Sequence, residues 1–321
     1  MVSRSLIVLL FFLSCCGCER PLSKPSSAPV VNSTPLARRV PGSDLRVASW
    51  NVRNFFDAVD DPNDDEVLKP EAYVAKLREM KVVLEALDAD FLALQEVEKL
   101  QCLRDLNGQL DKPYPQLGLI EGNDTRRGID VAFMSRIPVA AVYSHADFVL
   151  PAHPDTPSRY HFSRDCLEVQ LDTQPPTTVL VNHFKSSRGN SKKAAAKRYV
   201  QAQGAVELAA EVDYPEGRAM VLVGDLNDRQ DSWSLEPLFQ SFKDAFAQLP
   251  KEQRVTHRWR KGGSAIDHIL LDEDAAKVSG APKIWKDLGK QTSDHDPVSI
   301  QMTLSPNAES TVRVWDKPGK R

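Results

Sequence analysis

Short apolar segments alternate along the chain with longer amphipathic ones. Apolar runs of strand length, each bounded by polar or turn residues, predict β-strands at Leu45–Trp50, Asp90–Gln95, Ile129–Met134, Thr178–Asn182, Ala219–Val223, Ile266–Leu271 and Val298–Leu304. Between these strands lie segments whose apolar residues recur at helical spacing. Strands mixed with helices indicate a layered α/β domain, which we expect to span residues 45–304.

Two helices are predicted from apolar positions spaced by three and four residues, which give each helix one apolar face. The first rests on Tyr73, Leu77, Met80, Leu84 and Leu87. The second covers Lys192–Val212 and rests on Tyr199, Ala202, Val206 and Ala209. The tail, residues 305–321, alternates weakly through Val312, Val314 and Trp315. Its pattern fits either an added strand or a loose end.

The first 18 residues have the layout of an export signal. One cation, Arg4, precedes the apolar stretch Leu6–Leu13, and small residues and cysteines follow. The cysteines resemble a bacterial lipoprotein cleavage site, so we expect a lipid anchor in the bacterial envelope; the alternative is an ordinary cleaved signal for secretion. Residues 19–44 hold five prolines and five serines, which predicts a flexible linker. No apolar run reaches the length of a membrane span.

Composition narrows the possible functions. The net charge of −3 excludes a generally basic nucleic-acid-binding surface, so any polyanion site must come from local clustering. Three of the five cysteines stand in the leader, and the remaining Cys102 and Cys166 fit neither a disulfide framework nor a zinc ribbon. Whether these two pair is open at this point. We expect the domain to be a monomer.

Polar and ionisable residues stand repeatedly where the apolar runs begin or end. They are Asn51, Glu96, His183, Asp225, Asn227, Asp267, Asp294 and His295. Any one of them alone is more commonly a turn, cap or structural residue. The whole series at strand ends instead indicates the rim of an active site on a rigid scaffold.

The ordered segments WN, QEVE, NHFKS, GDLND, IDHIL and SDHDP resemble the endonuclease/exonuclease/phosphatase superfamily. These metal-dependent phosphodiesterases include pancreatic-type deoxyribonuclease, and the resemblance covers about residues 45–304. It implies a four-layer sandwich, in which two packed mixed sheets are flanked by helices and the site lies at one end. The NHFKS segment with the downstream KRYVQAQ helix is similar to bacterial secreted nucleases.

The resemblance also implies a metal site. Glu96 would be the principal ligand of a hard divalent cation, with Asn51 and Asp294 completing or supporting the shell. Ligation by oxygen atoms suits Mg²⁺, or alternatively Mn²⁺. Arg53 stands where the exonuclease branch of the family usually carries an aspartate for the metal, which leaves open whether one or two ions bind.

Catalytic roles follow from the same resemblance. Asp225 and Asn227 would position the attacking water or bind the phosphate oxygens in the transition state, and His183 and His295 would flank the scissile phosphate. Asp267 would orient His295, because an adjacent carboxylate fixes a histidine's tautomer and raises its pKa.

A supporting role is implied for one more acid, and a substrate-binding role for three cations. Asp130 would orient His183 in the same way, or else serve as a strand-end ion-pair partner. Arg53, Arg164 and Lys185 would contact substrate phosphate, and the alternative for the arginines is a surface ion pair.

The charge pattern favours a nucleic-acid substrate. No acid stands between Asp172 and Glu207, and this stretch carries Lys185, Arg188, Lys192, Lys193, Lys197 and Arg198. A second cluster, residues 257–261, mixes cations with Trp259. Both could track a polynucleotide, or could simply be solvated surface. We therefore predict an exported endonuclease acting on DNA or RNA. The alternatives are a phosphoesterase for lipid or inositol phosphates and a non-catalytic binding module.

Overall fold

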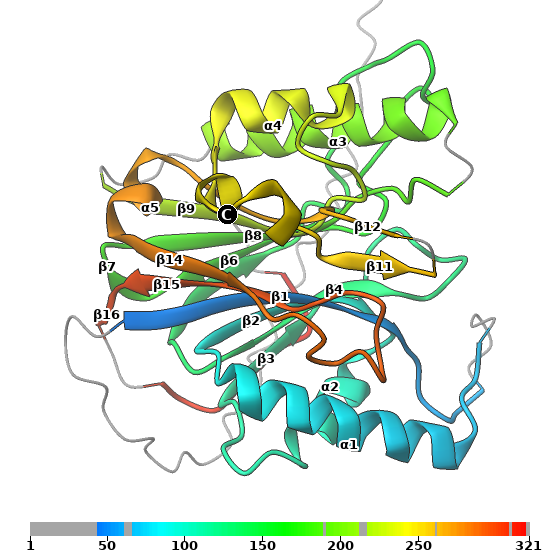
Figure 1. Cartoon of the computed structure of the whole chain (residues 1–321), viewed down its shortest axis with the longest axis vertical. Coiled ribbons are helices and arrows are strands. Elements are labelled where there is room, and N and C mark those ends of the chain that lie inside the picture. Colours follow the sequence, from blue (N-terminus) through cyan, green and yellow to red (C-terminus); the bar gives the residue numbers. More distant parts are fainter. Residues whose placement is uncertain are drawn as a thin grey trace, which may run out of the picture.

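Two mixed β-sheets pack face to face, and helices cover the outer face of each, so the predicted four-layer α/β sandwich is confirmed (Figure 1). The structure is a computed structural model that describes residues 44–60, 66–188, 191–211, 217–260, 262–307 and 310–318. The predicted signal peptide and all but the last residue of the predicted linker lie outside these ranges. Within them, no helix has both the length and the apolarity needed to span a bilayer.

The first sheet has seven strands in the order β14–β15–β1–β2–β4–β3–β17. Their bounds are β1 Asp44–Phe55, β2 Phe91–Val97, β3 Gln116–Leu119, β4 Asp130–Ser135, β14 Ser279–Ile284, β15 Val298–Thr303 and β17 Arg313–Trp315. At its centre, β1 runs parallel to β2 and antiparallel to β15. The carboxyl ends of β1 and β2 therefore lie at the same edge of the sheet.

The second sheet has six strands in the order β10–β13–β9–β8–β6–β5. Their bounds are β5 Val139–Tyr143, β6 Cys166–Leu171, β8 Thr177–His183, β9 Ala219–Asp225, β10 Lys243–Asp244 and β13 Asp267–Leu271. Two small ribbons accompany the sheets, formed by β11 His257–Trp259 with β12 Gly262–Ser264, and by β7 Thr173–Gln174 with β16 Ser305–Pro306.

The helices divide between the two outer faces. The first sheet is covered by α1 Pro70–Leu87 and α2 Leu100–Asn107, and the second by α3 Lys192–Glu211 and α4 Glu236–Ser241. Between them run α5 Glu273–Val278 and the 3₁₀ turns η1 Trp233–Leu235, η2 Ala245–Gln248 and η3 Lys251–Gln253. Proline in its first turn starts α1, and Asp88 ends it with a left-handed φ of 39°.

Three apolar layers hold these elements together. Strand β9 shows how the alternation of side chains builds two of the layers at once. Val221 and Val223 point into the layer between the sheets, whereas Met220 and Leu222 point into the layer under α3 and α4. Each such buried aliphatic side chain contributes about 1.5–3 kcal/mol to stability. Because both faces are buried, the strand reads as a continuous apolar run rather than as an alternating one.

All seven predicted strands and both predicted helices are present, with shifted ends. The first strand continues past Trp50 to Phe55, and Ile266 and Leu304 fall just outside the strands predicted to contain them. The undecided tail contributes the strand β17, which pairs in parallel with β3, so the first sheet extends beyond residue 304. Cys102 in α2 and Cys166 in β6 are both free and lie in different apolar layers, which rules out the disulfide left open by the sequence.

Candidate active site

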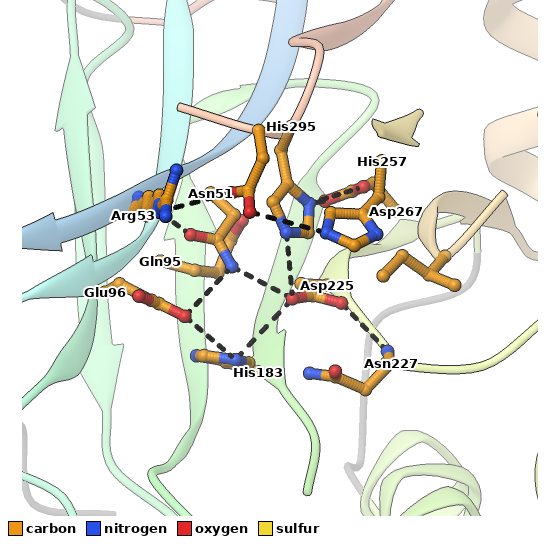
Figure 2. A network of polar contacts seen from close by, with 12 residues as sticks. Asn51, Arg53, Gln95, Glu96, His183, Asp225, Asn227, His257, Asp267 and His295 are labelled. Atoms are coloured by element: carbon orange, nitrogen blue, oxygen red, sulfur yellow. Dashed lines mark hydrogen bonds and ion pairs between the residues drawn. The ribbon is translucent and has the colours of Figure 1, made fainter. Parts of the chain in front are cut away.

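The predicted site residues gather at one end of the sandwich because the strands that carry them end there (Figure 2). In the second sheet, β8 and β9 are parallel, and their register places His183 beside Asp225. The antiparallel neighbour β13 begins with Asp267, which lies opposite Asp225. Three chemically active side chains thus follow one another across adjacent strands.

Asn51, in the C-terminal half of β1, connects the two sheets through its side-chain amide. Its Nδ2 donates to Asp225 Oδ2 over 2.9 Å and approaches Glu96 Oε1 at 3.4 Å. Its Oδ1 accepts the backbone N–H of Arg53 at 2.9 Å. One amide therefore holds a carboxylate from each sheet in a common position (Figure 2).

Glu96 reaches the site through an irregularity in β2. The register with β4 shifts between Gln95 and Val97, and Glu96 itself has a left-handed φ of 65°. Its Oε2 accepts the backbone N–H of Asn54 over 2.9 Å. Left-handed φ angles recur at Arg53 (50°), Asn54 (50°) and Asn227 (55°). Such backbone is costly for residues other than glycine and is characteristic of functional sites.

Gly224 allows β8 and β9 to approach closely just before His183 and Asp225. A Cβ atom at this residue would lie 1.9 Å from the carbonyl oxygen of Asn182, and its φ is 138°. No other residue fits this space. The close approach fixes the relation between the next residues, where His183 Nε2 lies 3.6 Å from Asp225 Oδ2.

His295 lies among carboxylates. Its Nδ1 lies 2.8 Å from Asp267 Oδ2, as expected, and the Thr256 hydroxyl donates to the same oxygen over 2.6 Å. Its Nε2 lies 3.8 Å from Asp225 Oδ2. Burial opposes the charged ring, but Asp267 and Asp225 outweigh it and raise the pKa of His295 to about 10. The ring is therefore an imidazolium at neutral pH.

His183 has the opposite character. Its Nε2 faces Asp225 at 3.6 Å and Glu96 Oε1 at 4.0 Å. Within the described residues its buried Nδ1 has no hydrogen-bond partner. Burial, reinforced by the charge of Arg164, holds the pKa of His183 well below its usual value, so this ring is neutral. Burial also raises the pKa of Asp225 to about 6.

The expectation that Asp130 orients His183 is wrong. The Asp130 carboxylate instead accepts the backbone N–H of Gly122 over 2.8 Å, and burial raises its pKa to about 7. Arg164, with 3% of its side chain exposed, pairs with Asp124 at 2.8 Å and donates to the carbonyl oxygen of Phe184, the residue after His183, at 3.4 Å. The guanidinium is enclosed by protein. Its predicted contact with substrate phosphate is not tested by this arrangement and stays a prediction.

Asp294 contacts Arg53 Nε at 3.8 Å and His257 Nε2 at 3.6 Å. Its predicted part in the metal shell stays a prediction. Burial would raise the pKa of Asp294, but the hydrogen bond with His257 and the charges of His295 and Arg53 lower it to about 2. Among the described residues, the ligand atoms of His257, Asp294 and His295 lie close enough together to hold a metal, and so do those of Asp225, Asp267 and His295.

The donor set around Asn51 fits a divalent cation. Glu96 and Asp225 are both acids, yet their carboxylates converge on the same amide and the same imidazole. Two carboxylates brought close together repel each other unless a cation neutralises them. Oxygen donors are those that hard divalent ions prefer. Which ion binds stays a prediction.

Several residues of the site gave no clear sequence signal. Arg127 contacts Asn54 Oδ1 and lies 3.4 Å from Glu96 Oε2. Lys76, on α1, donates to the backbone oxygens of Val52 and Arg53 at 2.9 and 2.7 Å, and burial lowers its pKa to about 8. Neither follows an apolar strand, which was the signal that found the others.

The predicted cationic stripe after His183 is smaller in space than in sequence. Arg198 is buried, pairs with Asp228 at 2.7 Å and donates to the Lys185 carbonyl, so it serves the fold. Lys192 is paired with Asp155 at 3.2 Å. Lys185 is partly buried, and burial lowers its pKa. The exposed cations Arg188 and Lys193 have no acidic partner in the part of the chain that the structure describes.

Known proteins share this sequence pattern and this fold. Residues 46–249 match the model of the endonuclease/exonuclease/phosphatase family. The crystal structure of SmcL is 17% identical, with a TM-score of 0.59 over 81% of this chain and 99% of that one. A humanized TDP2 of D. rerio is 19% identical, with a TM-score of 0.58 over 80% of this chain and 98% of that one. No curated protein sequence matches the chain significantly.

Proposed function

Because the chain belongs to the endonuclease/exonuclease/phosphatase family, whose members generally hydrolyse phosphodiester bonds, we propose that it is an exported, metal-dependent endonuclease acting on DNA or RNA. One observation carries the proposal. Glu96, Asp225 and two histidines, one charged and one neutral, converge at one end of the sandwich. This is the equipment that phosphodiester hydrolysis needs, namely a place for a cation, a base and a positive charge for the phosphate.

Glu96 and Asn51 would hold the divalent cation, with Asp294 as a further predicted ligand. When bound, the cation neutralises charge on the phosphate. Arg53, whose side chain is 59% exposed beside Asp294, would face the substrate phosphate from solvent.

Asp225 is suited to accept the proton of the attacking water. Its pKa of about 6 makes it a carboxylate that is still basic near neutral pH, and the backbone N–H of Asn227 donates to its Oδ1 over 2.9 Å. His295, charged and held through Nδ1 by Asp267, would present Nε2–H to the phosphate or the leaving oxygen. His183, neutral, would supply a hydrogen bond from the opposite side.

The test is a substrate panel of plasmid DNA, RNA, sphingomyelin and inositol phosphates, each with Mg²⁺ and with chelator. We expect Mg²⁺-dependent release of nucleic-acid fragments by the wild type and none by Glu96→Gln. Hydrolysis of sphingomyelin or inositol phosphates without cleavage of any nucleic acid would contradict the proposal.

A second test concerns the exposed cations. Reversing Arg188 and Lys193 to Glu should raise the KM for long nucleic acid and flatten its salt dependence, because fewer counterions are released on binding. Lys112→Glu is the matched control, since Lys112 is exposed near Arg136, at the end of β4 away from Glu96. Equal kinetics for both variants at low salt would mean that Arg188 and Lys193 are only solvated.

A lipid phosphoesterase is the second candidate, and one observation favours it. Trp259 on β11 is 52% exposed, and its ring lies 5.6 Å from that of His257, the neighbour of His295. An exposed tryptophan at the mouth of a site can insert into a lipid surface. Binding of the protein to anionic vesicles, lost in Trp259→Ala, would support this candidate.

A further inference from the structure

Three aromatic rings from distant parts of the chain pack together at the surface beside α3. His153 comes from the loop between β5 and β6, Tyr199 from α3 and Trp233 from η1. Their ring centroids lie 5.2 Å apart for Tyr199 and Trp233, 6.0 Å for His153 and Tyr199, and 6.3 Å for His153 and Trp233. Trp233 is 46% exposed. We call these three residues the aromatic platform.

The platform is fixed to the segments that carry the candidate active site. Arg198, the neighbour of Tyr199, donates to Asp228 over 2.7 Å and to the Lys185 carbonyl over 3.2 Å. Ser234, the neighbour of Trp233, donates to the same Asp228 carboxylate over 2.8 Å. Asp228 directly follows Asn227 in the chain. The rings of Tyr199 and Trp233 therefore each lie one residue away from a hydrogen-bond network. This network reaches the loop after His183 and the loop after Asp225.

Several cations precede the platform residue Tyr199 in the sequence, and some acids of the platform's segments are already paired. Lys197 lies 5.1 Å from the ring centre of Tyr160, and Arg188 and Lys193 are exposed nearby in the sequence before Tyr199. Three acids of the segments that carry the platform have a cationic partner, in the pairs Lys192–Asp155, Arg198–Asp228 and Arg229–Asp231. Exposed aromatic rings beside unpaired cations are the combination with which proteins bind single-stranded nucleic acid.

We propose that the aromatic platform is a stacking subsite for an unpaired nucleobase of the substrate strand, away from the scissile phosphate. The inference rests on the proposed nuclease function and adds to it a preference for substrates with single-stranded character. A base stacked on Trp233 strengthens binding by about 5- to 100-fold. A backbone without bases gains nothing from the platform.

The experiment measures dissociation constants by fluorescence anisotropy in the Glu96→Gln background, which holds substrate without cleaving it. The probes are a labelled single-stranded oligothymidylate and an abasic oligomer of the same length. Trp233→Ala should weaken binding of the oligothymidylate by about 5- to 100-fold and change binding of the abasic oligomer by less than about twofold. Trp233→Phe, which keeps a stacking ring, should restore most of the affinity. Val82→Ala, an exposed apolar residue on α1, is the remote control.

Equal losses for both oligomers, or no loss for either, would overturn the platform. Failure of the proposed function looks different, because the wild type would then hydrolyse a small phosphodiester but no polynucleotide. If the wild type cleaves polynucleotides and Trp233→Ala shows no base-selective loss, the platform alone is wrong. If neither oligomer binds at low salt, the platform and the nuclease assignment both fail.

Discussion

His295 and His183 are both buried at the same end of the sandwich, yet their surroundings make His295 a cation and leave His183 neutral. His295 lies between Asp267 and Asp225, and these carboxylates raise its pKa to about 10 in spite of burial. His183 is enclosed by protein, and the charge of Arg164 adds to the effect of burial, so its pKa falls well below the usual value. Burial acts in the same direction on both rings, so the sign of the neighbouring charge decides the outcome.

This difference divides the chemistry between the two rings. The imidazolium of His295 can stabilise negative charge or donate a proton, whereas the neutral His183 can only hydrogen-bond without changing the charge of the site. A shared residue lies between them, because Asp225 Oδ2 is 3.6 Å from one ring and 3.8 Å from the other. A substitution of either histidine should therefore also change the environment of Asp225.

The largest effect is expected on the His183 side, from the loss of the Glu96 carboxylate. Glu96→Gln keeps the shape of the side chain but removes a charge from the proposed cation site. Because a bound divalent ion contributes several kcal/mol to transition-state stabilisation, turnover should fall by about 10³-fold or more. Chelator should do the same to the wild type. Rates are measured with limiting and with excess Mg²⁺, and Glu85→Gln on the exposed face of α1 is the control. Near-normal activity of Glu96→Gln in limiting Mg²⁺ would refute the assignment.

Removing either histidine comes next. His183→Ala and His295→Ala should each lower kcat by roughly 10²–10⁴-fold, the usual contribution of a positioned acid or base. Because the two rings act on one phosphate through a shared Asp225, the double variant should be little slower than the single variants. Circular dichroism checks that each variant is folded. Fully multiplicative losses would mean that the rings work independently.

Asp267→Asn should reduce the difference in charge between His295 and His183 while keeping both rings. The largest favourable contribution to the raised pKa of His295 is then lost, so its pKa falls. Since His295 acts as a cation, activity is present below its pKa and lost above it. The alkaline limb of the kcat/KM profile should therefore move to lower pH, with a loss of about 10-fold at pH 8. The control is Asp111→Asn, an exposed acid away from the site. An unmoved alkaline limb would show that His295 is not the group that titrates there.

The smallest effect concerns the contribution of buried Asp130 to the free energy of unfolding. Burial raises the pKa of Asp130 from 3.8 to about 7, so its ionised form destabilises the fold above the unfolded-state pKa, and most strongly above pH 7. Asp130→Asn keeps the acceptor for the Gly122 N–H and removes that cost. Its free energy of unfolding should exceed that of the wild type by about 2–4 kcal/mol at pH 8 and match it below pH 4. Urea unfolding at both pH values tests this, and parallel pH dependences would contradict it.

Sequence reasoning reached the parts of the fold that bury apolar runs. Strands such as β8 and β9 are buried on both faces, so their runs are continuous, and the ionisable residue that ends each run is visible in the sequence. Short strands such as β3 and β11 carry too few residues to show a period. The ends of β1 and β2 were missed for a different reason, since bulges at the site displace the regular pattern.

Side-chain partners were the part that the sequence could not give. Arg198 looks like one more cation of a stripe, but the fold buries it against Asp228, thirty residues away. Asp130 stands at a strand end like the candidate site residues, yet its carboxylate turns to the Gly122 backbone. His183 and His295 read alike in the sequence, and only their neighbours in space give them different charges.

The tail strand β17 has a consequence for the behaviour of the molecule in solution. It covers β3, which would otherwise present unpaired backbone groups to the matching strand of another copy. Trp315 anchors it in the layer between the sheets, and Gln116 of β3 donates to the Ser310 hydroxyl nearby. The new border is only three residues long and carries Arg313, whose guanidinium lies 3.7 Å from the Trp315 ring centre. A short, cationic border is a poor template for strand addition, so the end of the chain guards this sheet against edge-to-edge aggregation.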